Sequence, residues 1–242
     1  MTTYSVREIW RYPVKSMAGE QLQTGTLETG GLPFDRAWAL QDTERGRICT
    51  GKNMPILMQC AARLLTDAAD GVARAAITLP DGDSVTSDDD AIDARLSDAL
   101  GRAVTLLPPR PDADADGRQG GYFDLATVHL LSDAAVRLLQ AKLPEIPIDR
   151  RRCRPNLLLA DDANAVGMVE FDWAGKILTV GTARLEVEAP TARCAMVTRA
   201  QGDLPAANDV LRTLFQDADG NMGVYARVAA PGAVTIGDRL EF

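Results

Sequence analysis

The segment Lys176-Ile-Leu-Thr-Val-Gly-Thr-Ala-Arg-Leu-Glu-Val-Glu188 largely alternates apolar and polar residues on either side of a glycine. Such alternation is typical of strands with one buried face, and a glycine between two of them favours a turn. The segment therefore predicts a β-hairpin. Arg36-Ala-Trp-Ala-Leu-Gln41 and the apolar run Leu157-Leu-Leu159 predict further strands. We therefore expect a β-dominated fold of the α+β class, with strands in both halves of the chain.

A first helix is predicted from about Ser87 to Gly101. Ser87 and Asp90 match a capping box, and a glycine is suited to end a helix. The acidic run 88–90 would then lie in the first turn, where carboxylates stabilise the positive end of the helix dipole. A metal site is the alternative interpretation of this run. The apolar residues of the buried face are Ile92, Leu96 and Leu100.

Two more helices are predicted in the second half. One runs from its N-cap Ser132 to Leu143, where Pro144 follows. The other covers residues 205–215, with Asp203 near its cap. The apolar residues expected on their buried faces are Val136, Leu139, Leu143, Val210, Leu211 and Leu214.

The composition is that of an ordinary globular protein. The 242 residues are 46% hydrophobic and 25% charged, and their formal net charge of −8 disfavours nucleic-acid binding, which needs a basic surface. No apolar run approaches the roughly 20 residues of a membrane-spanning helix, and the N-terminus lacks the pattern of a secretory signal. We therefore expect a cytoplasmic protein that binds neither nucleic acid nor a membrane.

Cysteine and histidine usage excludes several kinds of site. The four cysteines, Cys49, Cys60, Cys153 and Cys194, form no Cys-x-x-Cys pair, so neither a zinc knuckle nor an iron–sulfur cluster is indicated. His129 is the only histidine, which nearly excludes serine-type triads and histidine-rich metal sites. Any catalytic activity would therefore depend on other residues or on a bound cofactor.

The segment from Pro108 to Gly121 is the best candidate for a domain boundary. It is rich in Pro, Gly and Asp and shows no periodicity. It would separate residues 1–107 from residues 122–242. A long surface loop inside one domain is the alternative interpretation.

Tyr12-Pro-Val-Lys-Ser16 is the first segment that suggests chemistry. Pro13 ends a strand and is followed by a cation and a hydroxyl, Lys15 and Ser16, which together can hold one phosphate through hydrogen bonds. A solvated turn is the alternative. The pair Asp35-Arg36 then opens a further strand.

Arg150-Arg-Arg-Cys-Arg-Pro-Asn156 concentrates positive charge directly before the predicted strand at Leu157. Four arginines in seven residues are unusual in a chain of net negative charge. Guanidinium groups bind phosphate with two parallel hydrogen bonds, so the segment is interpreted as an anion cradle. A solvated charged loop is the alternative.

Ala189-Pro-Thr-Ala-Arg-Cys194 follows the predicted hairpin and precedes Ala195-Met-Val-Thr198, which looks like a strand. A cysteine beside Arg193 would lie in a positive field that lowers its pKa and favours the thiolate. Most lone cysteines are buried apolar residues, and Cys60 is expected to be one. Cys153 is expected to be partly buried and not catalytic.

Further strings accompany these segments: Gly19, Gly30-Gly-Leu32, Asp172-Trp173 and Pro231-Gly-Ala-Val-Thr-Ile-Gly-Asp238. In this order, and over nearly the whole chain, the strings resemble the MOSC family, in which a MOSC N-terminal β-barrel domain precedes the MOSC domain. The pattern is similar to that of two-domain proteins of the mitochondrial amidoxime-reducing component type. Those proteins bind a pterin-based molybdenum cofactor.

The resemblance implies an N-terminal β-barrel-like domain over residues 1–107, a linker or surface loop over 108–121, and a MOSC β-barrel domain with a few short helices over 122–242. The site is expected in the cleft between the domains. The resemblance makes Cys194 the protein ligand to molybdenum. The residues that it implies for binding the pterin and its phosphate are Lys15, Ser16, Arg36, Arg154, Asn156, Arg193 and, as weaker candidates before the second helix, Ser132 or Thr127.

Two positions depart from the family pattern. Ala192 stands where related proteins carry a serine, so one hydrogen bond near the metal is lost or supplied by Thr191. Lys52 stands where many carry an arginine, which keeps the charge but not the two-pronged geometry. Both changes bear on substrate range. We expect no C-terminal iron–sulfur module, and we therefore expect electrons to come from a separate electron-donor protein.

The leading hypothesis is an oxidoreductase that uses the molybdenum cofactor (molybdopterin) to remove oxygen from N-hydroxylated or similar small substrates. The cofactor would carry the redox chemistry while the protein positions it. A sulfur carrier that transfers persulfide sulfur from Cys194 is the first alternative. A non-enzymatic cofactor carrier is the second.

Overall fold

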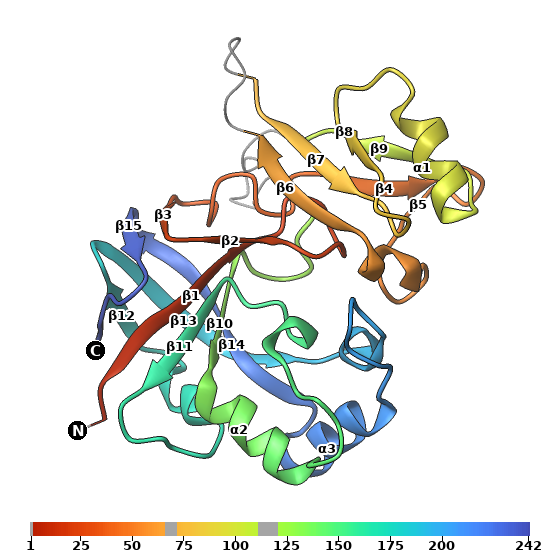
Figure 1. The fold of residues 1–242 in the computed structure, drawn as a ribbon. Coiled ribbons are helices and arrows are strands. Elements are labelled where there is room, and N and C mark those ends of the chain that lie inside the picture. Colours follow the sequence, from red (N-terminus) through yellow and green to blue (C-terminus); the bar gives the residue numbers. More distant parts are fainter. Residues whose placement is uncertain (1, 66–71, 111–120) are drawn as a thin grey trace.

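The computed structural model describes residues 2–65, 72–110 and 121–242 (Figure 1). Its strands are β1 Tyr4–Arg11, β2 Glu20–Leu22, β3 Thr24–Leu27, β4 Ala39–Asp42, β5 Arg47–Ile48, β6 Ala61–Leu65, β7 Arg74–Thr78, β8 Ser84–Thr86, β9 Val104–Leu107, β10 Val128–Ser132, β11 Leu157–Asp161, β12 Ile177–Val180, β13 Ala183–Ala192, β14 Asn221–Ala230, β15 Gly232–Thr235 and β16 Leu240–Glu241. Its α-helices are α1 Ile92–Leu100, α2 Asp133–Lys142 and α3 Asn208–Ala218, and its 3-10 helices are η1 Pro55–Gln59, η2 Arg150–Arg152, η3 Val169–Trp173 and η4 Ala195–Thr198. Strands therefore dominate, as the sequence predicts.

The largest sheet has eight strands in the order β16-β12-β13-β14-β10-β11-β1-β2. Only β10 and β11 run parallel; the other pairs are antiparallel. The predicted hairpin is confirmed as β12 and β13, in which Leu178 pairs with Leu185. Both side chains are buried, because alternate residues face the core.

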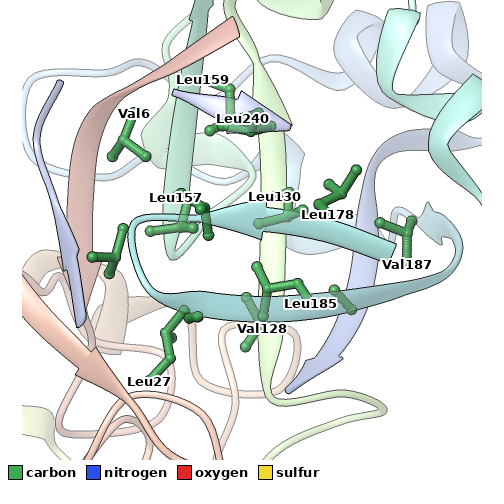
Figure 2. Close-up of a cluster of buried hydrophobic side chains, with 14 of the residues drawn as sticks. Val6, Leu27, Val128, Leu130, Leu157, Leu159, Leu178, Leu185, Val187 and Leu240 are labelled. Atoms are coloured by element: carbon green, nitrogen blue, oxygen red, sulfur yellow. The ribbon is translucent and has the colours of Figure 1, made fainter. Parts of the chain in front are cut away.

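The core of this sheet contains residues from both ends of the chain. Figure 2 shows Val6 and Leu27, from β1 and β3, in the same cluster as Leu157 and Leu185. All four are buried. The N-terminal strands are therefore integral to the C-terminal core.

A second core lies in the N-terminal part, between two three-stranded sheets and α1. The sheets have the orders β5-β4-β9 and β6-β7-β8. Trp38, Leu57, Ile77 and Leu96 are among its buried residues. A third cluster lies where α2 and α3 pack against the large sheet, as in the lower part of Figure 1.

The predicted helices occur, but two of them start later than expected. The cap of α2 is confirmed, because the Ser132 hydroxyl accepts a hydrogen bond from the Ala135 N–H at 3.0 Å. The capping box at Ser87 is wrong: the Ser87 hydroxyl instead accepts the Ala75 N–H of β7, and α1 begins at Ile92. The acidic run therefore precedes the helix, although Gly101 ends it in the left-handed conformation as expected.

Two further local predictions are wrong. The third helix, α3, begins at Asn208 rather than at residue 205. Asp203 forms an ion pair with Arg151 and does not cap this helix. The segment after Cys194 is the 3-10 helix η4 and not a strand, because its carbonyls bond within the turn.

Strand pairing crosses the predicted boundary between domains. β1 pairs with β11, and β3 pairs with β15, so residues before 28 complete sheets of the C-terminal part. Residues 111–120 of the predicted linker lie outside the described residues. The division at 107 and 122 remains a prediction.

Candidate functional site

One pocket contains seven of the predicted site residues. They are Lys15, Ser16, Arg36, Arg154, Asn156, Arg193 and Cys194. The first three come from loops that follow β1 and precede β4, while the others come from the approach to β11 and the end of β13. The pocket therefore lies where the N-terminal loops meet the large sheet, and its two walls are far apart in the sequence.

The backbone at three of these residues is held in the left-handed conformation. The φ angles of Ser16, Arg36 and Arg154 are 68°, 52° and 55°. This conformation costs a non-glycine residue about 1–2 kcal/mol and is found where surrounding contacts enforce it, often at functional sites. Here the Arg36 N–H donates to the Tyr12 carbonyl at 2.7 Å, and the Arg154 N–H donates to the Arg150 carbonyl at 2.9 Å. These bonds direct the two arginines into the pocket.

The ring of Tyr12 contacts the guanidinium groups of both Arg36 and Arg154. The centre of its ring is 4.2 Å from the guanidinium carbon of Arg154 and 4.9 Å from that of Arg36. Its hydroxyl donates to the Pro155 carbonyl at 3.0 Å. Burial raises the pKa of Tyr12 to about 12, so the ring stays neutral and its face attracts both cations.

Arg154 has an unused hydrogen-bond donor. Its Nη1 donates to the Met17 carbonyl at 2.5 Å, whereas its Nη2 is buried and has no partner in the part of the chain that the structure describes. Burial lowers the pKa of Arg154 to about 10, which still leaves it charged at neutral pH. A buried cationic donor without an acceptor is costly, and an anion in the pocket would satisfy it.

Asn156 lines the same pocket but its side chain is committed to the protein. Its amide nitrogen donates to Trp10 O at 3.2 Å and to Asp35 Oδ2 at 2.9 Å, and its oxygen accepts the His129 N–H at 3.1 Å. The amide therefore ties β1, β10 and the loop before β4 together beneath the pocket.

Arg193 is held in place by His129, which was not among the predicted site residues. Its Nη2 lies 2.9 Å from Nε2 of His129, and its Nη1 donates to the Cys153 carbonyl at 3.0 Å. Burial, and then the charge of Arg193, keep the pKa of His129 well below its usual value. The imidazole is therefore neutral and accepts the bond through Nε2.

Cys194 differs from the other three cysteines in its exposure. Cys49, Cys60 and Cys153 are buried, whereas Cys194 is half-buried and lines the pocket. Burial raises the pKa of the Cys60 thiol to about 11, and it also raises the pKa of Cys153, whose sulfur lies 3.5 Å from that of Met222. Cys194 is thus the most accessible of the four.

Ser132 and Thr127 are not brought to the pocket. Ser132 is fully buried, caps α2 and donates to the carboxylate of Glu170, so its hydroxyl is already engaged. Thr127 is also buried, and its hydroxyl has no partner in the described part of the chain. Thr191, the proposed substitute for the hydroxyl lost at Ala192, is likewise buried, and its hydroxyl has no partner among the described residues.

The pocket is also lined by residues that the sequence did not indicate, among them the polar Thr50, Asp124, His129 and Tyr225. Asp124 belongs to the predicted MOSC part, three residues beyond the expected linker, and no local pattern distinguishes it from other acidic residues. His129 could have been found, because the chain contains no other histidine.

The pocket is strongly cationic. Five basic side chains line it. Two of them have a carboxylate partner: Lys15 pairs with Asp124, and Arg36 pairs with the buried Asp35. Within the described residues, Arg152, Arg154 and Arg193 form no ion pair with a carboxylate. Their hydrogen-bond partners are backbone carbonyls and the neutral His129. In a chain of net charge −8, this local excess of positive charge favours an anionic ligand.

Comparison with known families identifies the chain. The MOSC domain matches residues 118–241, and the MOSC N-terminal beta barrel domain matches residues 3–102. The chain belongs to the MOSC family. The expected resemblance is therefore confirmed over both halves of the molecule.

Individual relatives are distant. The chain is 27% identical to a molybdenum cofactor sulfurase of Oryza sativa subsp. japonica, over an alignment that covers 86% of this chain and 30% of that protein. It thus spans less than a third of this relative's length. Among solved structures, the YuaD protein of Bacillus subtilis has 14% identity and a TM-score of 0.47, covering 99% of this chain and 94% of its own. YiiM of Geobacillus stearothermophilus has 20% identity and a TM-score of 0.35, and the match covers 48% of this chain and 53% of YiiM.

The described residues contain neither a membrane-spanning helix nor a cluster of protein metal ligands. Among the described residues, no helix has the length and apolar character to cross a membrane. In the same residues, no three His, Cys, Asp or Glu side chains are grouped so as to hold a metal ion. A metal at Cys194 would need its other ligands from a cofactor.

Proposed function

We propose that this MOSC protein binds a pterin-based molybdenum cofactor and acts as an oxidoreductase on N-hydroxylated or similar small substrates. The observation that carries the proposal is the buried Nη2 of Arg154, which has no partner among the described residues, in a cationic pocket that also contains Cys194. A phosphate-bearing ligand would accept a hydrogen bond from Nη2 of Arg154, and a thiophilic metal would bind the sulfur of Cys194.

The residues fit such a ligand on chemical grounds. Lys15, Arg36 and Arg154 provide charged donors for a phosphate, and Ser16 provides a hydroxyl. Cys194 provides one sulfur ligand, and no other cysteine among the described residues lines the pocket except the buried Cys153. When bound, the cofactor would supply the two-electron redox chemistry that removes the oxygen atom from the substrate.

The protein's own residues would bind and orient the cofactor. The Tyr12 ring would position Arg36 and Arg154, which it contacts, and neutral His129 would position Arg193 through its hydrogen bond. No side chain is required as a general base in this scheme. Reducing equivalents would come from a separate electron-donor protein.

Sulfur transfer is the second candidate. It is favoured by the similarity to a molybdenum cofactor sulfurase and by the partial exposure of Cys194, which would carry the sulfur as a persulfide. This route would need the thiol but not a bound metal.

The two candidates are separated by assaying the purified protein, prepared with and without the cofactor, in parallel. An oxidoreductase will reduce an N-hydroxylated amidine with an artificial electron donor only in the preparation that contains molybdenum. A sulfur carrier will show a persulfide mass at Cys194 in both preparations, after incubation with a persulfide donor. Reduction in neither preparation, together with a persulfide in both, would contradict the proposed oxidoreductase and favour sulfur transfer.

A further inference from the structure

Asp124 lies among the cations that are proposed to bind the ligand. Its carboxylate is 2.6 Å from Nζ of Lys15, and it is the only carboxylate among the described residues that line the pocket. Burial raises the pKa of Asp124, but the charges of Lys15, Lys52 and Arg36 more than offset this effect, so the pKa is below its usual value. Asp124 is therefore ionised, and it faces several cations at once.

Lys15 is held by the segment that contains Asp124. The ammonium group donates to the Tyr122 carbonyl and to the Asp124 carboxylate, both at 2.6 Å. Two of its three N–H donors are thus used by residues 122–124. The Lys15 side chain is only 11% exposed, so a ligand that approaches its ammonium group meets these two partners beside the one N–H donor that is left.

The segment Tyr122–Ala126 is anchored unevenly. Tyr122 is buried, its N–H donates to the Arg36 carbonyl at 2.8 Å, and its hydroxyl donates to Pro108 O at 3.0 Å. By contrast, the side chain of Asp124 is 62% exposed and Leu125 is 78% exposed. The outer part of the segment can therefore move into water at little cost in desolvation, while Tyr122 stays fixed.

We propose that Asp124 is an internal counter-ion of the pocket, which an incoming phosphate group displaces from Lys15 so that residues 124–126 move outward. This inference rests on the proposed function, because it assigns the same pocket to an anion. It makes Asp124 a determinant of ligand affinity, since the carboxylate competes with the ligand for Lys15. It also makes ligand binding detectable as a local change of this segment.

The test is a calorimetric titration of the full chain with inorganic phosphate at low ionic strength. Asp124→Asn removes the competing charge and is expected to bind phosphate about three- to tenfold more tightly than the wild type. Asp217→Asn is the matched control, because Asp217 pairs with Lys142 at 3.3 Å, outside the pocket, and its removal changes the net charge equally. The control is expected to bind as the wild type does.

Hydrogen–deuterium exchange provides a second readout. In the wild type, phosphate should increase deuterium uptake in the peptide that covers residues 122–126, and Asp124→Asn should show high uptake before phosphate is added. Equal phosphate affinity in the wild type and in Asp124→Asn, with unchanged uptake, overturns the internal counter-ion but leaves the anion pocket intact. Phosphate binding by none of the variants overturns both this inference and the proposed pocket.

Discussion

Tyr12 keeps two like charges close together at the pocket. The guanidinium groups of Arg36 and Arg154 both contact its ring, and Arg36 also pairs with the buried Asp35. The residue thus acts on the ligand through its neighbours, and its aromatic face matters more than its hydroxyl. This distinction can be tested by two substitutions at one position.

We expect Tyr12→Leu to weaken phosphate binding about tenfold, because each cation loses an attraction of about 0.5–2 kcal/mol. Tyr12→Phe keeps the ring and should bind phosphate within about twofold of the wild type. It should lose only about 1 kcal/mol of unfolding free energy with the hydrogen bond to Pro155. Equal phosphate affinity in the two variants, measured by calorimetry, would show that the ring does not position the arginines.

Two cysteines that line the same pocket are predicted to differ in function. Cys194→Ser should abolish both reduction and persulfide formation and leave the fold intact, because a hydroxyl is neither a soft ligand nor ionised near neutral pH. Cys153→Ser should keep the activity and lose about 1 kcal/mol or more of unfolding free energy, because it places a hydroxyl beside Met222. Activity assays and chemical denaturation measure both effects. Wild-type rates in Cys194→Ser would make the assignment of Cys194 wrong.

At the scale of elements, a buried carboxyl connects α2 to the large sheet. Glu170 in η3 is fully buried, accepts from Ser132 at the N-terminus of α2 and accepts the Gly223 N–H of β14 at 3.1 Å. Burial raises the pKa of Glu170 to about 7, against hydrogen bonds that lower it. The folded protein therefore holds this proton more tightly than the unfolded chain does.

This difference predicts how stability depends on pH. Because the folded pKa lies above the unfolded value of 4.5, the stabilisation is fully present below pH 4.5 and is lost as the pH rises through about 7. The change amounts to about 3 kcal/mol. Glu170→Gln cannot ionise, so its unfolding free energy should vary less over this range. Identical pH profiles for the two proteins in urea denaturation would refute the assignment.

Elements with a local signal could be predicted from the sequence. The β12–β13 hairpin follows from alternation, and the cap of α2 follows from a serine that lies three residues before the N–H group it binds, at Ala135. The start of α1 could not be predicted, because the Ser87 hydroxyl binds β7, a strand that lies earlier in the chain. The cationic site residues were suggested by family motifs, whereas Asp124 becomes recognisable only when folding brings it to Lys15.

For the whole molecule, the pairing of β1 with β11 and of β3 with β15 makes the N-terminus part of the C-terminal sheet. A fragment of residues 122–242, the predicted MOSC domain, would expose the edge of β11 and lose Val6, Ile9 and Leu27 from its core. We expect this fragment to be unfolded or aggregated at 25 °C. A cooperative thermal transition of the isolated fragment, measured by circular dichroism, would contradict this expectation.

The central claim, that the pocket between the N-terminal loops and the large sheet binds the molybdenum cofactor, is tested most directly by cofactor content. Molybdenum and pterin would be measured in wild-type protein and in Arg154→Met, both purified from a host that makes the cofactor, with Arg212→Met as a control on the exposed surface of α3. The account predicts molybdenum and pterin in equimolar amounts with the wild type and the control, and their loss from a folded Arg154→Met. Wild-type protein that is folded but contains neither, or an Arg154→Met variant that retains both, would contradict it.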